Sequence, residues 1–148
     1  MEIKKIESKQ VFFKSLQSSL QTLTADVGET PRTMEIEMAE LGINAAGPQE
    51  WIYNGSDGDP STQFTLDICI PVNKIIDNNP SFKTIEGKKC AIETHKGAWA
   101  NLGNTYDKLF QEIMEAGESP TQTSREVYHN CNFEDQESCI TEVQIELK

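Results

Sequence analysis

A chain of 148 residues suffices for one domain or for two small halves that pack closely together. Its net charge of −11 argues against a nucleic-acid partner, because binding to phosphates needs a basic face. Only 36% of the residues are hydrophobic, and no apolar run approaches the ~20 residues that span a bilayer, so we expect no membrane partner. The N-terminal segment lacks the apolar core of a signal peptide, which predicts a cytoplasmic protein.

The four cysteines and two histidines lack the spacing of a zinc site, so we expect neither a metal nor a cofactor. Cys69 and Cys90 lie in apolar strand patterns and are expected to be core thiols. Cys131 and Cys139 flank a polar loop and could face each other across a hairpin. In a reducing cytosol all four thiols are expected to stay free.

The first half alternates strand and helix signals. We expect a strand over 10–20, a polar connection over 23–28, and then a short helix. Thr30 and Pro31 suit the cap and the first position of that helix, and Gly42 ends it. Two further strands are expected, separated by an acidic, turn-rich loop. They cover 50–54 and 63–72, and the second has one apolar face formed by Phe64, Leu66, Ile68 and Ile70.

A second unit begins near residue 80. Its first strand is expected over 82–94, with a turn at Glu86 and Gly87. A long amphipathic helix follows, and Gly117 and Pro120 end it. Its apolar stripe recurs at spacings of three and four: Trp99, Leu102, Tyr106, Leu109, Phe110, Ile113 and Met114. The last strands are expected over 124–130 and 139–147, joined by the polar loop 131–138.

The strand 124–130 holds the most unusual polar residue in the chain. Because strand side chains alternate, Glu126 and Tyr128 share one face, while Arg125, Val127 and His129 share the other. Glu126 therefore lies beside an aromatic residue and is expected to point inward. Taken by itself, it would be an ordinary strand carboxylate, since most such groups are paired or solvated at the surface.

The two halves also resemble each other in order and spacing. Tyr53 aligns with Tyr128, and Thr65 aligns with Thr141. Each half is expected to be a strand–helix–strand–strand unit too small to bury its own helix, so the two should pack about a pseudo-twofold axis. The predicted fold class is α+β, an antiparallel sheet with two helices and a central cleft where a ligand would bind.

Several segments together resemble one known family: His95–Leu102, Tyr106–Leu109, Gly117, Pro120, Arg125–Tyr128 and Thr141–Val143. In this order they are similar to the gyrase-inhibitor-like (GyrI-like) small-molecule-binding family, whose fold is also the effector-binding domain of AraC- and MerR-type multidrug-responsive regulators. The resemblance is close from Cys90 to the end and looser before it. It implies a single standalone effector-binding domain over 1–148, with half-repeats at about 8–74 and 80–148.

The resemblance also implies a ligand site. In that family a buried glutamate lies at the bottom of an aromatic cleft and pairs with cationic, often aromatic, drugs. By position this residue is Glu126. The candidate cleft walls are Trp51, Tyr53, Trp99 and Tyr128, although each ring could equally belong to the core. Trp99 stands where the family often has a tyrosine. A carboxylate in such a cleft is costly to ionise, and a bound cation would offset that cost.

Three functions follow from the resemblance. The first is binding of amphipathic, cationic aromatic ligands by Glu126. The second is hydrolysis of strained or ester-like small molecules, with Glu126 and Tyr128 as catalytic residues. A tyrosine hydroxyl near Glu126 in a small closed cleft would favour the hydrolase, and a wide open aromatic groove would favour the binder. The third, inhibition of gyrase by protein contact, is suggested by the family name alone. No helix-turn-helix segment is expected, so the regulator role does not carry over.

The other notable residues are interpreted as structural. Tyr106 lies in the middle of the helix stripe and is expected in the core. Arg125 is expected to pair with Glu142 on a neighbouring strand. His95 is expected to cap or precede the long helix rather than act as a base. Glu142 is the rival carboxylate, and facing Glu126 it would form a pair that shares a proton.

Overall fold

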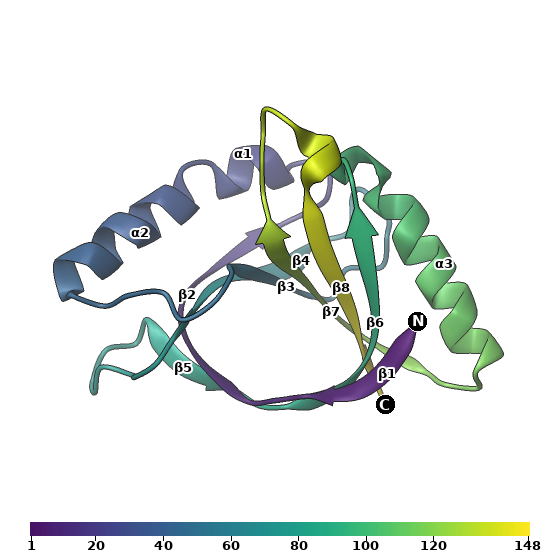
Figure 1. Cartoon of the computed structure of the whole chain (residues 1–148), viewed down its shortest axis with the longest axis horizontal. Coiled ribbons are helices and arrows are strands. Elements are labelled where there is room, and N and C mark those ends of the chain that lie inside the picture. The colour runs from purple at the N-terminus through teal and green to yellow at the C-terminus, as the bar shows by residue number, and fades with distance from the viewer.

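Eight antiparallel strands form one sheet in the order β1-β6-β8-β7-β3-β4-β2-β5 (Figure 1). The structure is a computed structural model that describes residues 1–148. The strands are β1 Glu2–Ile6, β2 Lys9–Ser18, β3 Glu50–Asn54, β4 Phe64–Val72, β5 Phe82–Ile85, β6 Lys88–Lys96, β7 Pro120–Asn130 and β8 Ile140–Leu147. The helices are α1 Leu23–Val27, α2 Thr30–Leu41 and α3 Leu102–Glu115, with short 3-10 turns η1 Trp99–Asn101 and η2 Gln136–Ser138.

Two equivalent units build this sheet, β2-α2-β3-β4 and β6-α3-β7-β8. The spatial strand order is the same in both, β2-β4-β3 and β6-β8-β7, and the units join through β3 and β7. Trp51 of β3 lies directly opposite Glu126 of β7 across this junction. The α+β fold and the pseudo-twofold repeat predicted from the sequence are therefore confirmed. The two remaining strands each pair with the other unit. Strand β1 precedes the first unit but pairs with β6 of the second, and β5 precedes the second unit but pairs with β2 of the first.

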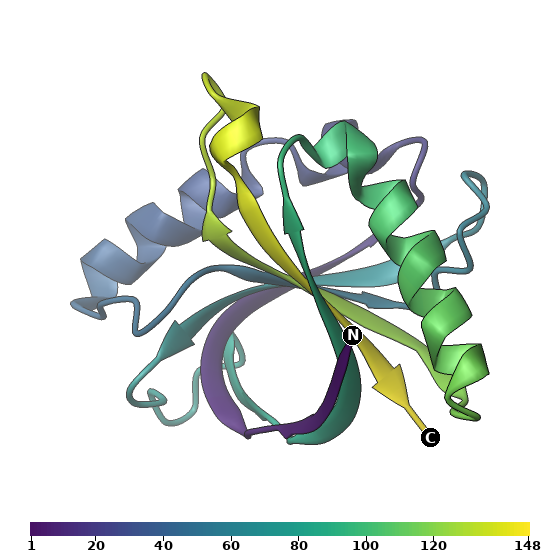
Figure 2. The ribbon, with the colours of Figure 1, turned by 45° about the vertical axis from the view of Figure 1, so that its right-hand side comes forward.

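Each long helix covers its own unit, and both lie on the same side of the sheet (Figure 2). Their buried residues occupy equivalent positions, Met34 and Met38 in α2 and Leu109 and Ile113 in α3. They belong to two separate hydrophobic clusters, one under each helix. Both helices are followed by a glycine with positive φ, Gly42 at 71° and Gly117 at 72°, as the sequence predicts. The central strands β3 and β7 run between the two clusters.

Three local predictions were wrong. Strand β1 was missed because four of its five residues are exposed and its sequence, EIKKI, has no strand pattern. The connection expected over 23–28 contains the short helix α1, held by the buried Val27. The alignment of Thr65 with Thr141 is off by one position. Tyr53 lies opposite Leu66 and Tyr128 lies opposite Thr141, so Leu66 is the counterpart of Thr141. A shift of one residue places a side chain on the other face of the sheet.

On the side of the sheet without helices, the β1–β2 and β5–β6 connections cross (Figure 2). The Gly87 amide donates a hydrogen bond to Ser8 Oγ at 3.1 Å. A Cβ atom at Gly87 would lie 2.4 Å from the Ile6 carbonyl oxygen, so only glycine permits this approach. The contact holds the two connections together on this side of the sheet. No helix has the length and apolar character needed to span a membrane.

Candidate functional site

The carboxylate of Glu126 lies beneath three tyrosine hydroxyl groups. The residue is only 7% exposed. Its Oε1 atom accepts hydrogen bonds from Tyr128 Oη at 2.7 Å and from Tyr53 Oη at 3.4 Å. Its Oε2 atom accepts one from Tyr106 Oη at 2.7 Å. All three hydroxyls donate, so the arrangement satisfies an ionised carboxylate without any cation from the chain.

The repeat explains why these groups converge. Trp51 and Glu126 face each other at the centre of the sheet, and Tyr53 and Tyr128 each follow two residues later on their strands. Alternation along both strands therefore brings both hydroxyls to the same carboxylate. The Trp51 ring packs edge-on against Tyr128, with centroids 5.5 Å apart. Tyr106 reaches the site from α3, which lies over the second unit.

Trp99 lies at the border of this cluster. Its Nε1 atom donates to Thr141 Oγ1 at 3.2 Å, and Thr141 is the residue opposite Tyr128 in the sheet. The other side of the indole packs against Phe133, with ring centroids 5.2 Å apart. Phe133 belongs to the β7–β8 loop and is 78% exposed. The sequence-predicted wall residues thus surround Glu126 in one neighbourhood, with Trp99 further from the carboxylate than the tyrosines.

Burial sets the protonation of this site. It raises the pKa of Glu126, and the hydrogen bonds from Tyr106, Tyr128 and Tyr53 and the charge of His95 oppose that rise. Burial and then the Glu126 charge raise the pKa of all three tyrosines well above the ordinary value, so they stay protonated donors. Glu126 takes part in none of the ion pairs of the chain. It is a buried acid with no counter-ion.

A family model of GyrI-like small molecule binding domains matches residues 1–148. The chain belongs to the GyrI-like family. No curated protein sequence matches it. Among solved structures, the C-terminal domain of EcmrR superposes with a TM-score of 0.82 at 22% identity, covering 99% of this chain and 96% of that domain. The chain spans 56% of the EcmrR chain seen in a DNA complex.

Two further solved structures share this GyrI-like fold. SAV2435, bound to tetraphenylphosphonium, gives a TM-score of 0.68 at 14% identity and covers 99% of this chain and 93% of its own. A hydrolase from Listeria innocua gives 0.62 at 12% identity, with coverage of 99% and 92%. At these identities the similarity establishes the fold.

Tyr106 is the member of this GyrI-like site that the sequence interpretation missed. It packs against the hydrophobic cluster under α3, as expected, but its hydroxyl reaches Glu126. The helical stripe gives the face on which a side chain lies and not the partner of its hydroxyl. A signal was present, because a tyrosine in an otherwise apolar stripe needs a polar partner when it is buried.

His95 holds the start of α3 to the sheet of the GyrI-like domain. Its Nδ1 atom lies 2.7 Å from Thr105 Oγ1, and its Nε2 atom lies 2.9 Å from the Ala98 carbonyl oxygen. Both ring nitrogens are therefore engaged at the entrance to the helix, in keeping with a structural role. Its charge still reaches Glu126, where it lowers the pKa.

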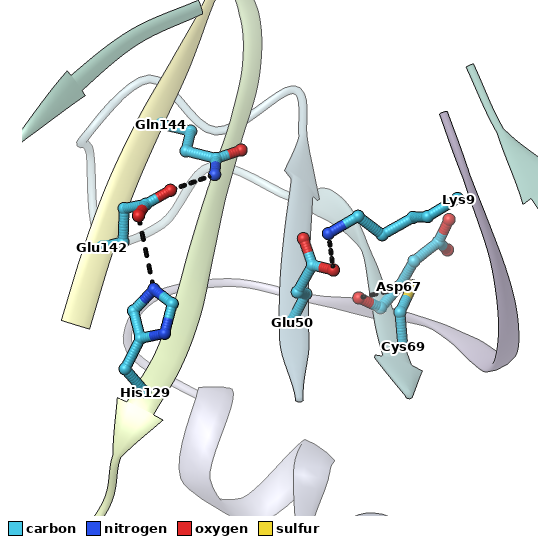
Figure 3. Close-up of polar contacts among 7 residues, drawn as sticks. All are labelled: Lys9, Glu50, Asp67, Cys69, His129, Glu142 and Gln144. Carbon is cyan, nitrogen blue, oxygen red and sulfur yellow. Dashed lines mark hydrogen bonds and ion pairs between the residues drawn. The ribbon is translucent and has the colours of Figure 1, made fainter. Parts of the chain in front are cut away.

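The predicted pairing of Arg125 with Glu142 is wrong, and the condition for a dyad of Glu142 with Glu126 is not met. Glu142 lies opposite Val127, on the face away from Glu126, so the two carboxylates form no dyad. Its oxygens contact His129 Nε2 at 3.3 Å and the Gln144 amide (Figure 3). Arg125 lies opposite Gln144 instead and forms no pair with Glu142. Sequence spacing gave the right faces but could not give the register between strands.

The carboxylate of Glu126 is buried beneath its three tyrosine donors. Two surface hollows of the GyrI-like domain lie elsewhere, one at the 75–82 loop and one on the opposite sheet face, and Glu126 lines neither. No group of three or more His, Cys, Asp or Glu side chains is placed to hold a metal ion. The site is therefore a compact hydrogen-bonded cluster between two hydrophobic cores.

Proposed function

We propose that this GyrI-like domain binds amphipathic aromatic cations, with Glu126 as the recognition group. The observation that carries the proposal is a buried carboxylate held by three hydroxyl donors with no positive side chain paired to it. Such a group is disfavoured in its charged form, and a cation placed beside it would remove that disadvantage. The net charge of −11 would also attract cations from a distance.

The aromatic surroundings fit the same ligand class. Trp51, Tyr53 and Tyr128 lie against or near the carboxylate, and Trp99 lies at the border. Aromatic faces attract cations and also bury apolar rings. An aromatic cation would therefore gain both charge pairing and ring packing, whereas a neutral molecule of the same shape would gain only the packing.

Entry of a ligand requires part of the closed cluster to move. Tyr106 comes from α3 and Phe133 from the β7–β8 loop, so both are carried by elements outside the central strands. Displacement of the Tyr106 hydroxyl would free Oε2 of Glu126 for the ligand. The strands β3 and β7 would keep Trp51, Tyr53 and Glu126 in place.

The test is calorimetric titration with a cation and a neutral analogue, tetraphenylphosphonium and triphenylphosphine oxide. Breaking one side of a buried charge pair costs about 2–5 kcal/mol, so Glu126→Gln should weaken the cation tenfold or more. The neutral ligand should change little. Glu142→Gln makes the same charge change on the opposite face and is the matched control. Equal losses for both ligands in Glu126→Gln would show that Glu126 supports the fold and not recognition.

Hydrolysis is a second candidate, because a buried Glu126 with tyrosine hydroxyls in hydrogen-bond distance is the arrangement expected above for a hydrolase rather than for a wide binding groove. Two tyrosine hydroxyls, of Tyr128 and Tyr106, lie 2.7 Å from a buried carboxylate whose pKa is raised by burial. That arrangement suits a general base with a neighbouring proton donor. The discriminating measurement is product formation from a strained or ester-like substrate. Wild type would turn it over and Glu126→Gln would not, whereas a pure binding protein returns every ligand unchanged.

A further inference from the structure

The sheet face opposite Glu126 carries a buried arginine without a partner. Arg125 precedes Glu126 on β7 and therefore points to the side without helices. It is only 3% exposed, and its Nε and Nη1 atoms are buried with no hydrogen-bond acceptor. Burying a guanidinium without an acceptor is costly, so an unpaired one in a folded chain needs an explanation.

Three carboxylates near Arg125 have other partners, although Oε1 of Glu50 accepts no hydrogen bond. Glu50, Asp67 and Glu142 lie on neighbouring strands of the same face (Figure 3). Their partners are Lys9 at 2.7 Å for Glu50, Lys83 at 2.6 Å and Ser15 for Asp67, and His129 and Gln144 for Glu142. Arg125 takes part in none of these pairs. Glu146 of β8 lies on the same face and likewise forms no ion pair, so the guanidinium of Arg125 is the buried cation of this face without a direct partner.

Arg125 also lines a hollow of about 210 Å³. The walls come from the sheet strands and from the crossing at Gly87. They include Lys88, and also Lys83, whose charge is already paired with Asp67 of the same wall. One water molecule has a share of roughly 30 Å³ in the liquid, so the hollow has room for several waters or one small molecule. The unpaired guanidinium therefore faces a space that a ligand can enter.

We propose that this hollow binds a small oxyanion, a carboxylate or a phosphate, on the guanidinium of Arg125. A guanidinium offers five donors in a planar fork that matches both groups. Lys88 at the same hollow forms no ion pair within the chain and adds positive charge. Glu86 and Glu146 also line the hollow and oppose an anion, so the site selects small ligands that stay close to Arg125.

This site is separate from the one proposed at Glu126. The two residues are consecutive on β7, but their side chains lie on opposite faces of the sheet. Both sites can be filled at once, and the anion site stands whether or not Glu126 binds cations.

The composition of the chain allows a direct test by NMR. Arg32 and Arg125 are the only arginines, so a spectrum of arginine side chains contains two Nε–H resonances. Arg32 is exposed on α2 and serves as the internal reference. Inorganic phosphate and acetate are titrated separately at constant ionic strength. We expect a saturable shift of the Arg125 resonance with at least one of them and no saturable shift of Arg32. Equal, unsaturable shifts of both resonances, or no shift, overturn the proposal.

Variants locate the site. Arg125→Gln should weaken the anion about tenfold or more, because hydrogen bonds to charged groups are the strong ones. Arg32→Gln removes the same charge from the surface and should bind as wild type does. Glu146→Gln removes an opposing charge from the hollow and should tighten binding. If Arg125 were instead held by Glu146 through water, Glu146→Gln would not tighten binding, and that result would overturn the site as described.

Discussion

The two halves of the sheet share one skeleton but carry different chemistry at its centre. Trp51 and Glu126 occupy equivalent positions and lie opposite each other, and α2 and α3 cover the two units in equivalent positions. Tyr53 and Tyr128 are equivalent and both donate to the same carboxylate oxygen. The helices differ, because α3 contributes Tyr106 while the equivalent position of α2 is Pro31 at its first turn. The symmetric fold brings the side chains of both halves together at Glu126, and the residues that differ between the halves give this cluster its carboxylate and its third hydroxyl.

The two halves should contribute similarly to the stability of the folded chain. Met34 and Leu109 are equivalent and fully buried, one under each helix. Replacing either with alanine should cost about 2–5 kcal/mol of unfolding free energy, from lost burial and the cavity left behind. Because the halves share one sheet, both variants should unfold in a single cooperative transition by chemical denaturation. Two separate transitions would show that the units fold independently and that the shared centre is not a unifying core.

The second prediction sharpens the difference between the helices. Tyr106→Phe removes a donor at 2.7 Å, whereas Tyr53→Phe removes one at 3.4 Å. A hydrogen bond to a charged group contributes about 1.5–3 kcal/mol, so Tyr106→Phe should raise the pKa of Glu126 further, and Tyr53→Phe should raise it less. Cation binding strengthens as pH rises through that pKa. The pH at which binding is half-maximal should therefore move upward in both variants, and further in Tyr106→Phe than in Tyr53→Phe. A larger shift for Tyr53→Phe would contradict the geometry.

The third prediction concerns stability against pH and is the smallest effect. The pKa of Glu126 is raised in the folded chain. Well below the ordinary glutamate value, about 4.3, the carboxyl is protonated in both folded and unfolded chains, so Glu126→Gln should match wild type. Above that value the unfolded chain ionises first, and wild type loses stability relative to the variant until the raised pKa is passed. The variant should therefore be the more stable one at neutral pH in thermal unfolding, and a less stable variant would contradict a raised pKa.

Much of the fold could be predicted because its signals are local. The stripe of the long helix, the glycines after both helices and the alternation around Glu126 each depend on neighbouring residues only. Strand β1 could not be predicted, since its exposed charged residues carry no burial pattern and its place in the sheet is set by pairing with β6. An edge strand of this kind is specified by the strand it pairs with rather than by its own sequence pattern.

The candidate site could be predicted only as far as its signals are local. Alternation and the resemblance placed Glu126 with Tyr53 and Tyr128, but the register between β7 and β8 was needed to separate Arg125 from Glu142. The hydrogen bond from Tyr106 to Glu126 depends on how α3 packs on the sheet, and the spacing of apolar residues along the helix does not give that packing. The β3–β4 and β7–β8 loops are equally long, so the spacing that aligns Tyr53 with Tyr128 already gives Leu66 as the counterpart of Thr141, and the alignment with Thr65 departed from that spacing.

The central claim is that a buried, unpaired carboxylate recognises a cation. The most direct measurement is a pH titration of the Glu126 side-chain carboxyl carbon by NMR, in the free protein and with saturating tetraphenylphosphonium. In the free protein we expect the pKa of Glu126 to lie above the ordinary glutamate value, because burial disfavours the charge. With the cation bound, we expect a lower pKa and release of protons on binding. An ordinary pKa in the free protein, or the same pKa with and without the cation, would show that Glu126 does not recognise the cation by charge.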